Sequence, residues 1–278
     1  MKIGIVANQV KKEAVALADK VIKYLDTLNI ESVYCQNVYD DVKEASLLDN
    51  VDYIIVLGGD GTILGLVRKL NNKKIPILGI NFGSFGFIAE SDPNDYKISI
   101  DRLINEDYYI SERIMLKGSV YKSHKTEPDI YYSMNEFVIG KADINRLLSI
   151  ETYINNEFLV NYKADGIIVS CATGSTAYNL SAGGPVMHPG VKAYIITPIC
   201  PHTLNERPLI VPKSEILKVK IKEGQKALFT VDGQSNEILN CNDYVEIEAG
   251  KDTVRLVEFD RFGFYDKLKS RLFWGKQI

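Results

Sequence analysis

The chain has 278 residues, enough for one large domain or two ordinary ones, and its 46% hydrophobic and 25% charged residues are typical of a globular protein with a buried core. A formal net charge of −3, without a concentrated basic face, predicts no nucleic-acid partner. No apolar run is long enough to cross a bilayer and the first residues do not resemble a signal peptide, so we expect a cytoplasmic protein without membrane attachment.

The first part of the chain alternates between strand and helix patterns. Its apolar runs lack polar alternation, which is typical of strands that helices cover on both faces. This order predicts an α/β, Rossmann-like domain with a parallel sheet over residues 1–112. We expect strands at 2–7, 33–34, 53–57 and 75–80 and helices at 11–28 and 63–70.

After Arg113 the hydrophobic pattern changes to a period of two, which predicts strands. Asn155-Asn156 separates two such runs and predicts a hairpin. A short helix is expected at 176–182. We therefore expect a mostly-β domain over residues 113–258.

The tail over 259–278 returns to helical spacing and is expected to pack back on the first domain. Its basic residues are interleaved with apolar ones, so we expect them on the solvated side of this helix. They are Lys267, Lys269, Arg271 and Lys276.

The cysteines and histidines give no sign of a bound metal. The four cysteines form no CxxC pair, and the three histidines lie in no HExxH or similar array. We expect reduced thiols and no metal site held by the protein alone.

The most specific motif is Gly58-Gly59-Asp60-Gly61-Thr62, between a predicted strand and a predicted helix. Its glycines let the backbone approach a ligand closely, and the helix N-terminus offers unpaired N–H groups to a phosphate. An aspartate at the centre repels phosphate but suits contact with a hydroxyl group or with a metal ion that phosphates hold. The motif is neither a Walker A loop nor a GxGxxG fingerprint, and a plain strand–helix turn capped by Asp60 explains it equally well.

Three further segments could complete a nucleotide site. Gly79–Phe87 follows the next strand, so both glycine clusters would meet at the carboxyl edge of the sheet, where open α/β sheets bind ligands. Thr173–Tyr178 offers hydroxyl and N–H donors and leaves room for a nucleotide, although helix capping would explain part of it. Asn135-Glu136 could match an adenine edge and ribose hydroxyls, with a simple strand-edge turn as the alternative.

Taken together, these segments resemble the NAD kinase family over nearly the whole chain. GGDG alone also occurs in lipid kinases and phosphofructokinases, whereas GGDG with TGSTAY at this spacing is specific. The matching motifs are GGDGT at 58–62, the glycine-rich segment at 79–87, NE at 135–136, ADG at 164–166, TGSTAY at 173–178, PICPH at 198–202 and DGQ at 232–234.

The resemblance implies transfer of a phosphoryl group from ATP, with a divalent metal ion such as Mg²⁺, to the adenosine-ribose 2′-hydroxyl of NAD. Asp60 would be the catalytic residue, in a homodimer or homotetramer where some NAD contacts cross a subunit boundary. The phosphate loop would consist of Gly58, Gly59, Gly61 and Thr62. NAD would be bound by Asp60, Gly61, Phe87, Asn135, Glu136, Arg146, Lys163, Asp165, Thr176, Ala177, Tyr178, Asn179, Leu180, Ser181 and Gln234.

The chain departs from the family pattern at two places. Ser170-Cys171-Ala172 stands where Ser-Thr-Pro is common, and Gly65 stands where the family often has Arg or His. The second change puts a phosphate contact from that position in doubt. The alternatives are a lipid or sugar kinase of the same superfamily, against which TGSTAY argues, and a non-catalytic dinucleotide sensor, which would not need Asp60.

Overall fold

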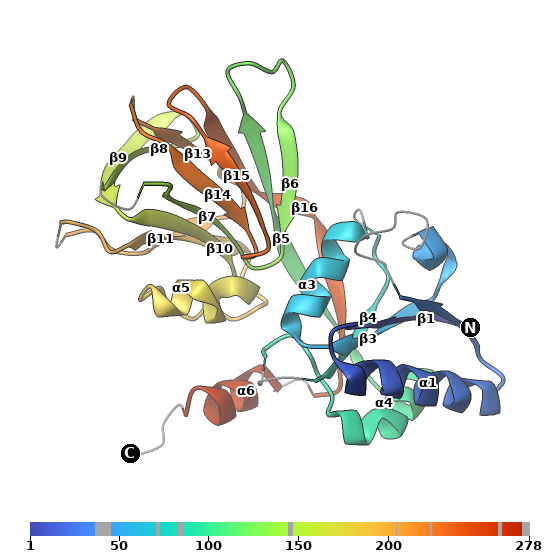
Figure 1. The fold of residues 1–278 in the computed structure, drawn as a ribbon. Helices are drawn as coiled ribbons and strands as arrows, with labels where there is room; N and C mark the ends of the chain where they lie inside the picture. Colours follow the sequence, from blue (N-terminus) through green and yellow to red (C-terminus); the bar gives the residue numbers. More distant parts are fainter. Residues whose placement is uncertain are drawn as a thin grey trace. The chain divides into compact units, whose positions relative to one another are not determined.

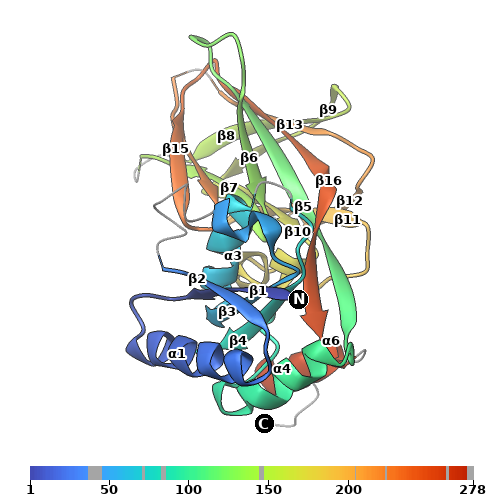
Figure 2. The same ribbon diagram turned by 90° about the vertical axis from the view of Figure 1, so that its right-hand side faces the viewer.

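The computed structural model describes residues 1–36, 46–70, 73–82, 86–143, 147–203, 205–222, 224–260 and 263–273. The chain divides into two compact units (Figure 1). Unit 1 comprises Met1–Glu112 and Val254–Ile278, and unit 2 comprises Arg113–Thr253. The long strands β5 (Tyr109–Tyr121) and β16 (Tyr244–Glu258), which pair with each other, carry the chain from one unit to the other (Figure 2).

Unit 1 is built on a parallel sheet in the order β2-β1-β3-β4, and the end of β16 pairs in parallel with β4. Almost every residue of the three inner strands is buried, because helices lie on both faces. The predicted Rossmann-like α/β architecture is confirmed. The strands are β1 (Lys2–Ala7), β2 (Glu31–Cys35), β3 (Tyr53–Gly58) and β4 (Ile77–Asn81).

Two helices, α1 (Lys12–Thr27) and α4 (Tyr96–Ile104), share one face of this sheet with a common apolar core (Figure 1). Helix α3 (Asp60–Lys69) lies on the other face, where its Ile63 side chain fills the space above Gly79. The described residues of unit 1 also form short helical turns at Leu47–Asn50 and Pro93–Asp95 and helix α6 (Gly263–Arg271).

Unit 2 packs two sheets against each other around one apolar core. Its centre includes stacked Phe137 and Phe229, with ring centroids 5.1 Å apart. One sheet has the order β12-β11-β10-β7-β14-β15, and the other joins the first part of β16 to β13, β8 and β9. The bounds are β6 (Asp129–Ser133), β7 (Glu136–Lys141), β8 (Leu148–Ile154), β9 (Glu157–Ala164), β10 (Gly166–Cys171), β11 (Ala193–Ile199), β12 (Leu209–Pro212), β13 (Leu217–Ile221), β14 (Ala227–Val231) and β15 (Ser235–Leu239).

The predicted mostly-β character of this region and its hairpin are confirmed. Strands β8 and β9 pair antiparallel on either side of Asn155 and Asn156. Both asparagines have positive φ, 50° and 70°, which asparagine tolerates better than most residues and which matches a type I′ turn.

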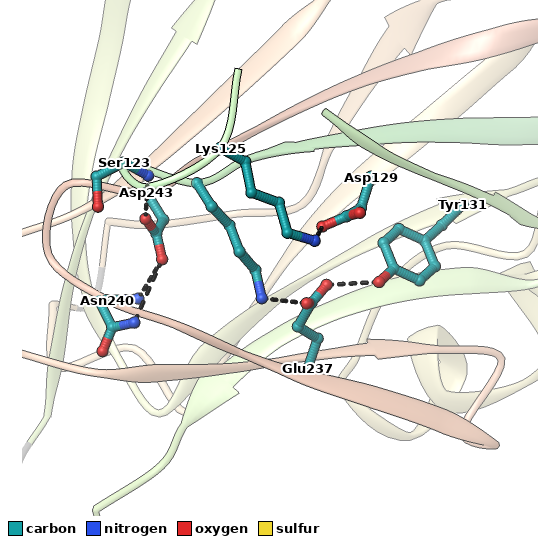
Figure 3. A network of polar contacts seen from close by, with 8 residues as sticks. Ser123, Lys125, Asp129, Tyr131, Glu237, Asn240 and Asp243 are labelled. Carbon is teal, nitrogen blue, oxygen red and sulfur yellow. Dashed lines mark hydrogen bonds and ion pairs between the residues drawn. The ribbon is translucent and has the colours of Figure 1, made fainter. Parts of the chain in front are cut away.

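A polar network joins the β5–β6 hairpin to β15 and to the turn before β16 (Figure 3). Glu237 on β15 accepts hydrogen bonds from Lys122 and from the Tyr131 hydroxyl. Nearby, the buried Asp243 carboxylate accepts the backbone N–H groups of Ser123 and Asn240, each at 2.9 Å. These contacts satisfy polar groups of the turns, so we assign the network a structural role.

Candidate functional site

The GGDGT motif was expected between a strand ending at residue 57 and a helix beginning at residue 63, but most of it belongs to these two elements. Gly58 ends β3, Gly59 is the N-cap of α3, and Asp60 is already the first helical residue. Thr62 is buried and its hydroxyl accepts the Asn8 side-chain amide at 3.2 Å. A side chain at Gly58 would collide with Thr62, so this glycine is needed for close packing at the strand end.

The Asp60 carboxylate accepts backbone hydrogen bonds from the next glycine-rich segment. Its donors are the N–H groups of Phe87 at 2.7 Å, Ala89 at 3.1 Å and Ile88 at 3.2 Å. A side chain at Gly86 would collide with this carboxylate. The two segments therefore lie side by side after neighbouring strands, as predicted, while Gly83, Ser84 and Phe85 lie outside the described residues.

Helix α6 contacts the segment that Asp60 holds. Lys267 pairs with Glu90 at 2.7 Å, with only 12% of the Lys267 side chain exposed. The Arg271 guanidinium lies over the Phe87 ring, 5.5 Å from its centroid, and its Nη1 atom is buried without a hydrogen-bond partner. The expectation that these two side chains are solvated was therefore wrong, because the apolar part of each packs on unit 1 while its charge faces a carboxylate or a ring.

The Arg271 charge lies in the field of Asp60. Burial lowers the pKa of the guanidinium, and the negative charges of Asp60 and Glu90 oppose that effect. An arginine keeps its proton in proteins, so the Asp60 region of unit 1 contains a fixed cation with a free donor. Neither the motif nor the spacing of the tail had identified Arg271 as a candidate site residue.

In unit 2, the turn Met134–Glu136 has every backbone polar group satisfied. The N–H groups of Asn135 and Glu136 donate to Asp232 Oδ1 at 2.9 and 3.2 Å, and that of Met134 donates to Oδ2 at 3.4 Å. The Cys171 N–H and thiol donate to the carbonyls of Asn135 and Met134 at 3.0 and 2.7 Å. The Asp232 N–H donates to the Glu136 carbonyl at 3.0 Å, so the backbone of the turn is fully bonded within unit 2.

In contrast to the backbone, the side chains of this turn are not fully hydrogen-bonded. Asn135 Oδ1 and Glu136 Oε2 are buried and have no hydrogen-bond partner. Burial, with a contribution from the negative charge of Asp232, raises the pKa of Glu136 to about 8. Buried oxygens without partners are unusual in folded proteins and commonly mark a site that a ligand completes.

Thr173–Tyr178 packs against the same turn. Gly174 lies so close to the Asn135 carbonyl that any side chain at this position would collide with it. The segment forms a 3₁₀ turn over Thr173–Thr176, breaks at Ala177, and continues as the short helix α5 (Tyr178–Ser181). The Tyr178 ring is partly exposed, so it remains available to a ligand.

Asn179 has a structural role. Its amide donates to the carbonyls of Ser175 and Pro185, at 3.0 and 3.1 Å, and its oxygen accepts the Thr197 hydroxyl at 2.6 Å. These bonds hold the TGSTAY segment in place. The neighbouring Leu180 is half-buried, while Ser181 and Gln234 are exposed.

Lys163 and Asp165 are not brought together with the Asn135 turn within one chain. Asp165 precedes the first residue of β10 and pairs with Lys141 at 2.7 Å, whereas Cys171, beside Asn135, is the last residue of β10. Six residues of strand separate the two ends by about 17 Å. Arg146 lies outside the described residues.

Within the described ranges, no group of three or more His, Cys, Asp or Glu side chains is placed to hold a metal ion. Among the helices of these same residues, none is both long and apolar enough to span a bilayer.

Comparison with known proteins agrees with this arrangement. The ATP-NAD kinase N-terminal domain model matches residues 40–108, and the ATP-NAD kinase C-terminal domain model matches residues 134–259. An NAD kinase from Syntrophotalea carbinolica is 35% identical over 284 residues, covering 99% of both chains. One from Lachnoclostridium phytofermentans is 36% identical, covering 97% of this chain and 98% of its own.

Solved structures share the fold. The yeast NADH kinase complexed with NADH has a TM-score of 0.91 at 22% identity and covers 100% of this chain and 89% of its own. An NAD kinase from Archaeoglobus fulgidus in complex with ATP has a TM-score of 0.79 at 22% identity, covering 97% and 99%. Since both domain models match in order and relatives above 30% identity align over nearly the full length, the chain belongs to the ATP-NAD kinase family.

Proposed function

We propose that this protein transfers the γ-phosphoryl group of ATP to the adenosine-ribose 2′-hydroxyl of NAD and so forms NADP. The observation that carries the proposal is family membership over both units, with the GGDG and TGSTAY motifs intact. The unsatisfied oxygens of Asn135 and Glu136 support it, because a nucleoside offers the complementary donors and acceptors.

In the reaction, the 2′-oxygen forms a bond to the γ-phosphorus while the bond from that phosphorus to the β–γ bridging oxygen breaks, releasing ADP. The hydroxyl proton would pass to Asp60. A carboxylate has about four acceptor positions, so the three backbone donors on Asp60 leave capacity for the substrate hydroxyl. Arg271 would offer its free Nη1 to a phosphate oxygen near Asp60, as positively charged donors do in other phosphoryl transfers.

The binding contacts would come mainly from unit 2. Asn135 and Glu136 would hold an adenosine portion of NAD, and Tyr178 would cover a ring of the dinucleotide. Lys163, near the end of β9, and Asp165, which directly precedes β10, would serve the site of a partner subunit in a homodimer or homotetramer. A cytoplasmic location and a role in NADP biosynthesis belong to the same proposal.

A divalent cation would enter with ATP, whose phosphates supply oxygen ligands that the described protein residues do not gather by themselves. When bound, the cation neutralises phosphate charge. Binding and orienting NAD and moving the hydroxyl proton are left to the side chains described above.

The test is a donor and acceptor panel with the purified protein. NAD with Mg-ATP should yield NADP, and Asp60→Asn should lower the rate by at least about 100-fold while NAD binding stays measurable. Asp266→Asn is the control, because Asp266 is an exposed helical aspartate that forms a local ion pair with Lys269. Urea unfolding of each variant separates lost chemistry from lost folding.

Two outcomes would overturn the proposal. NAD binding without NADP formation would indicate a dinucleotide sensor. Phosphorylation of diacylglycerol or of a sugar in place of NAD would indicate another kinase of the superfamily.

A further inference from the structure

The Asp232 carboxylate accepts hydrogen bonds from the backbone of the Asn135–Glu136 turn, although Asp232 lies 97 residues from Asn135 in the sequence. Besides the three backbone N–H groups, its Oδ1 atom accepts the Ser133 hydroxyl at 2.6 Å. Asp232 sits on the turn between β14 and β15 and is only 7% exposed. One carboxylate therefore joins the start of β7 to a separate hairpin of unit 2.

The two carboxyl groups at this place have unequal surroundings. Asp232 receives four donors, which stabilise a negative charge, whereas Glu136 Oε2 receives none. In the described part of unit 2, the titratable groups facing Glu136 are Asp232, from the β14–β15 turn, and Cys171, from β10. Burial raises the pKa of the Cys171 thiol to about 11, so Cys171 stays neutral and leaves Asp232 as the charge that acts on Glu136.

We propose that Asp232 is a positioning residue for NAD: its carboxylate accepts four hydrogen bonds, holds the Asn135–Glu136 turn in its binding shape and places a negative charge near the Glu136 side chain. Burial favours the protonated form of Glu136 when the nucleoside binds, and the negative charge of Asp232 adds to this effect. A protonated carboxyl group has one O–H donor and retains acceptor capacity, so Glu136 can pair with either kind of group on the nucleoside. The inference rests on the proposed function, which identifies the ligand of this turn as NAD.

Two substitutions separate the two roles of Asp232. Asp232→Asn keeps an oxygen at Oδ1 but removes the charge, whereas Asp232→Ala removes both. Asp243→Asn is the matched control, because Asp243 is also a buried carboxylate of unit 2 that accepts backbone N–H groups, but it does so in the network of Figure 3 and not at this turn.

The experiment measures NAD affinity without ATP by calorimetry between pH 6 and pH 9.5, and the KM for NAD and kcat with Mg-ATP. Wild-type binding should weaken as pH rises through about 8, where Glu136 ionises. In Asp232→Asn the weakening should begin at lower pH, because Glu136 then loses its proton more readily. Asp232→Ala should raise the KM for NAD at pH 6.5 by about tenfold or more, with a much smaller change in kcat.

The result for the control decides between positioning and general stability. Asp243→Asn should leave the KM and the pH profile at their wild-type values. Wild-type affinity and an unshifted profile in Asp232→Asn would overturn the inference while NADP formation continued, even if Asp232→Ala failed to fold. An equal effect of Asp243→Asn would overturn it as well. A wild-type protein that neither bound nor phosphorylated NAD would overturn the proposed function and this inference with it.

Discussion

Glu136 illustrates how burial of one ionisable residue links stability to pH. In the folded protein its pKa is raised from the ordinary 4.5 to about 8, first by burial and then by the charge of Asp232. Between these values the unfolded chain has lost the proton and the folded chain keeps it. The free energy of unfolding should therefore fall as pH rises from about 5 to about 8.

The substitution Glu136→Gln tests this coupling, because glutamine imitates the protonated form at every pH. The variant should match the wild type near pH 5 and exceed it at pH 8.5 by roughly 2–4 kcal/mol in the free energy of unfolding. Urea unfolding at the two pH values measures the difference. Glu157→Gln, at an exposed position at the start of β9, should show no such pH-dependent gap, and a gap of constant size for Glu136→Gln would contradict the account.

Individual residues also show where sequence reasoning reached its limit. Asn135 and Glu136 could be singled out as binding candidates, and the structure leaves an oxygen of each unpaired. Asp232 was visible only as part of a DGQ motif, since nothing in local periodicity tells which distant turn a buried carboxylate will hold. The role of Gly174 was not predictable either. Its lack of a side chain permits contact with the Asn135 backbone, but nothing in the sequence distinguishes it from other small residues.

At the scale of elements, helix α6 stabilises the segment that Asp60 holds. Its Lys267 pairs with Glu90, and both side chains are nearly buried, whereas Lys269 pairs with Asp266 in solvent. Removing one partner of a buried pair leaves a charge without compensation, but an exposed pair contributes little.

We therefore expect Lys267→Met to lower the free energy of unfolding by roughly 3 kcal/mol and Lys269→Met to change it by less than about 0.5 kcal/mol. Urea unfolding followed by circular dichroism measures both. NADP formation should fall only in Lys267→Met, because Lys267 also reaches the Phe87 carbonyl of the segment bonded to Asp60. Equal effects of the two substitutions would show that α6 is not coupled to this segment.

Most helices and strands were predictable from the sequence, and the differences between their predicted and observed bounds have local causes. The hairpin at Asn155–Asn156 follows from residues that tolerate positive φ. Helix α3 begins at Asp60, three residues before the apolar periodicity indicated, because the Gly59 carbonyl already accepts the first helical hydrogen bonds. Apolar periodicity indicates the buried face of a helix, but it does not predict a first turn that has no apolar residue.

At the scale of the whole molecule, the sequence was sufficient for the fold class and the family, since binary patterning and motif order are properties of the chain itself. Individual side-chain contacts between distant segments were not predictable in this way. Arg271 and Phe87, for example, meet through the packing of α6 in unit 1. Such pairs depend on tertiary structure and cannot be predicted from the spacing of apolar residues along the sequence.

The proposed requirement for a divalent cation can be tested directly. In the proposed reaction the cation is bound by the phosphates of ATP, so it should enter with ATP and should not support the fold. EDTA should therefore abolish NADP formation and leave the melting temperature and NAD affinity unchanged, and the rate should follow the concentration of Mg-ATP when Mg²⁺ is titrated back. Calorimetry and a coupled NADP assay in the same buffer make the comparison. A lower melting temperature in EDTA, or a metal ion that remains with the protein through purification, would instead indicate a site built by the chain itself.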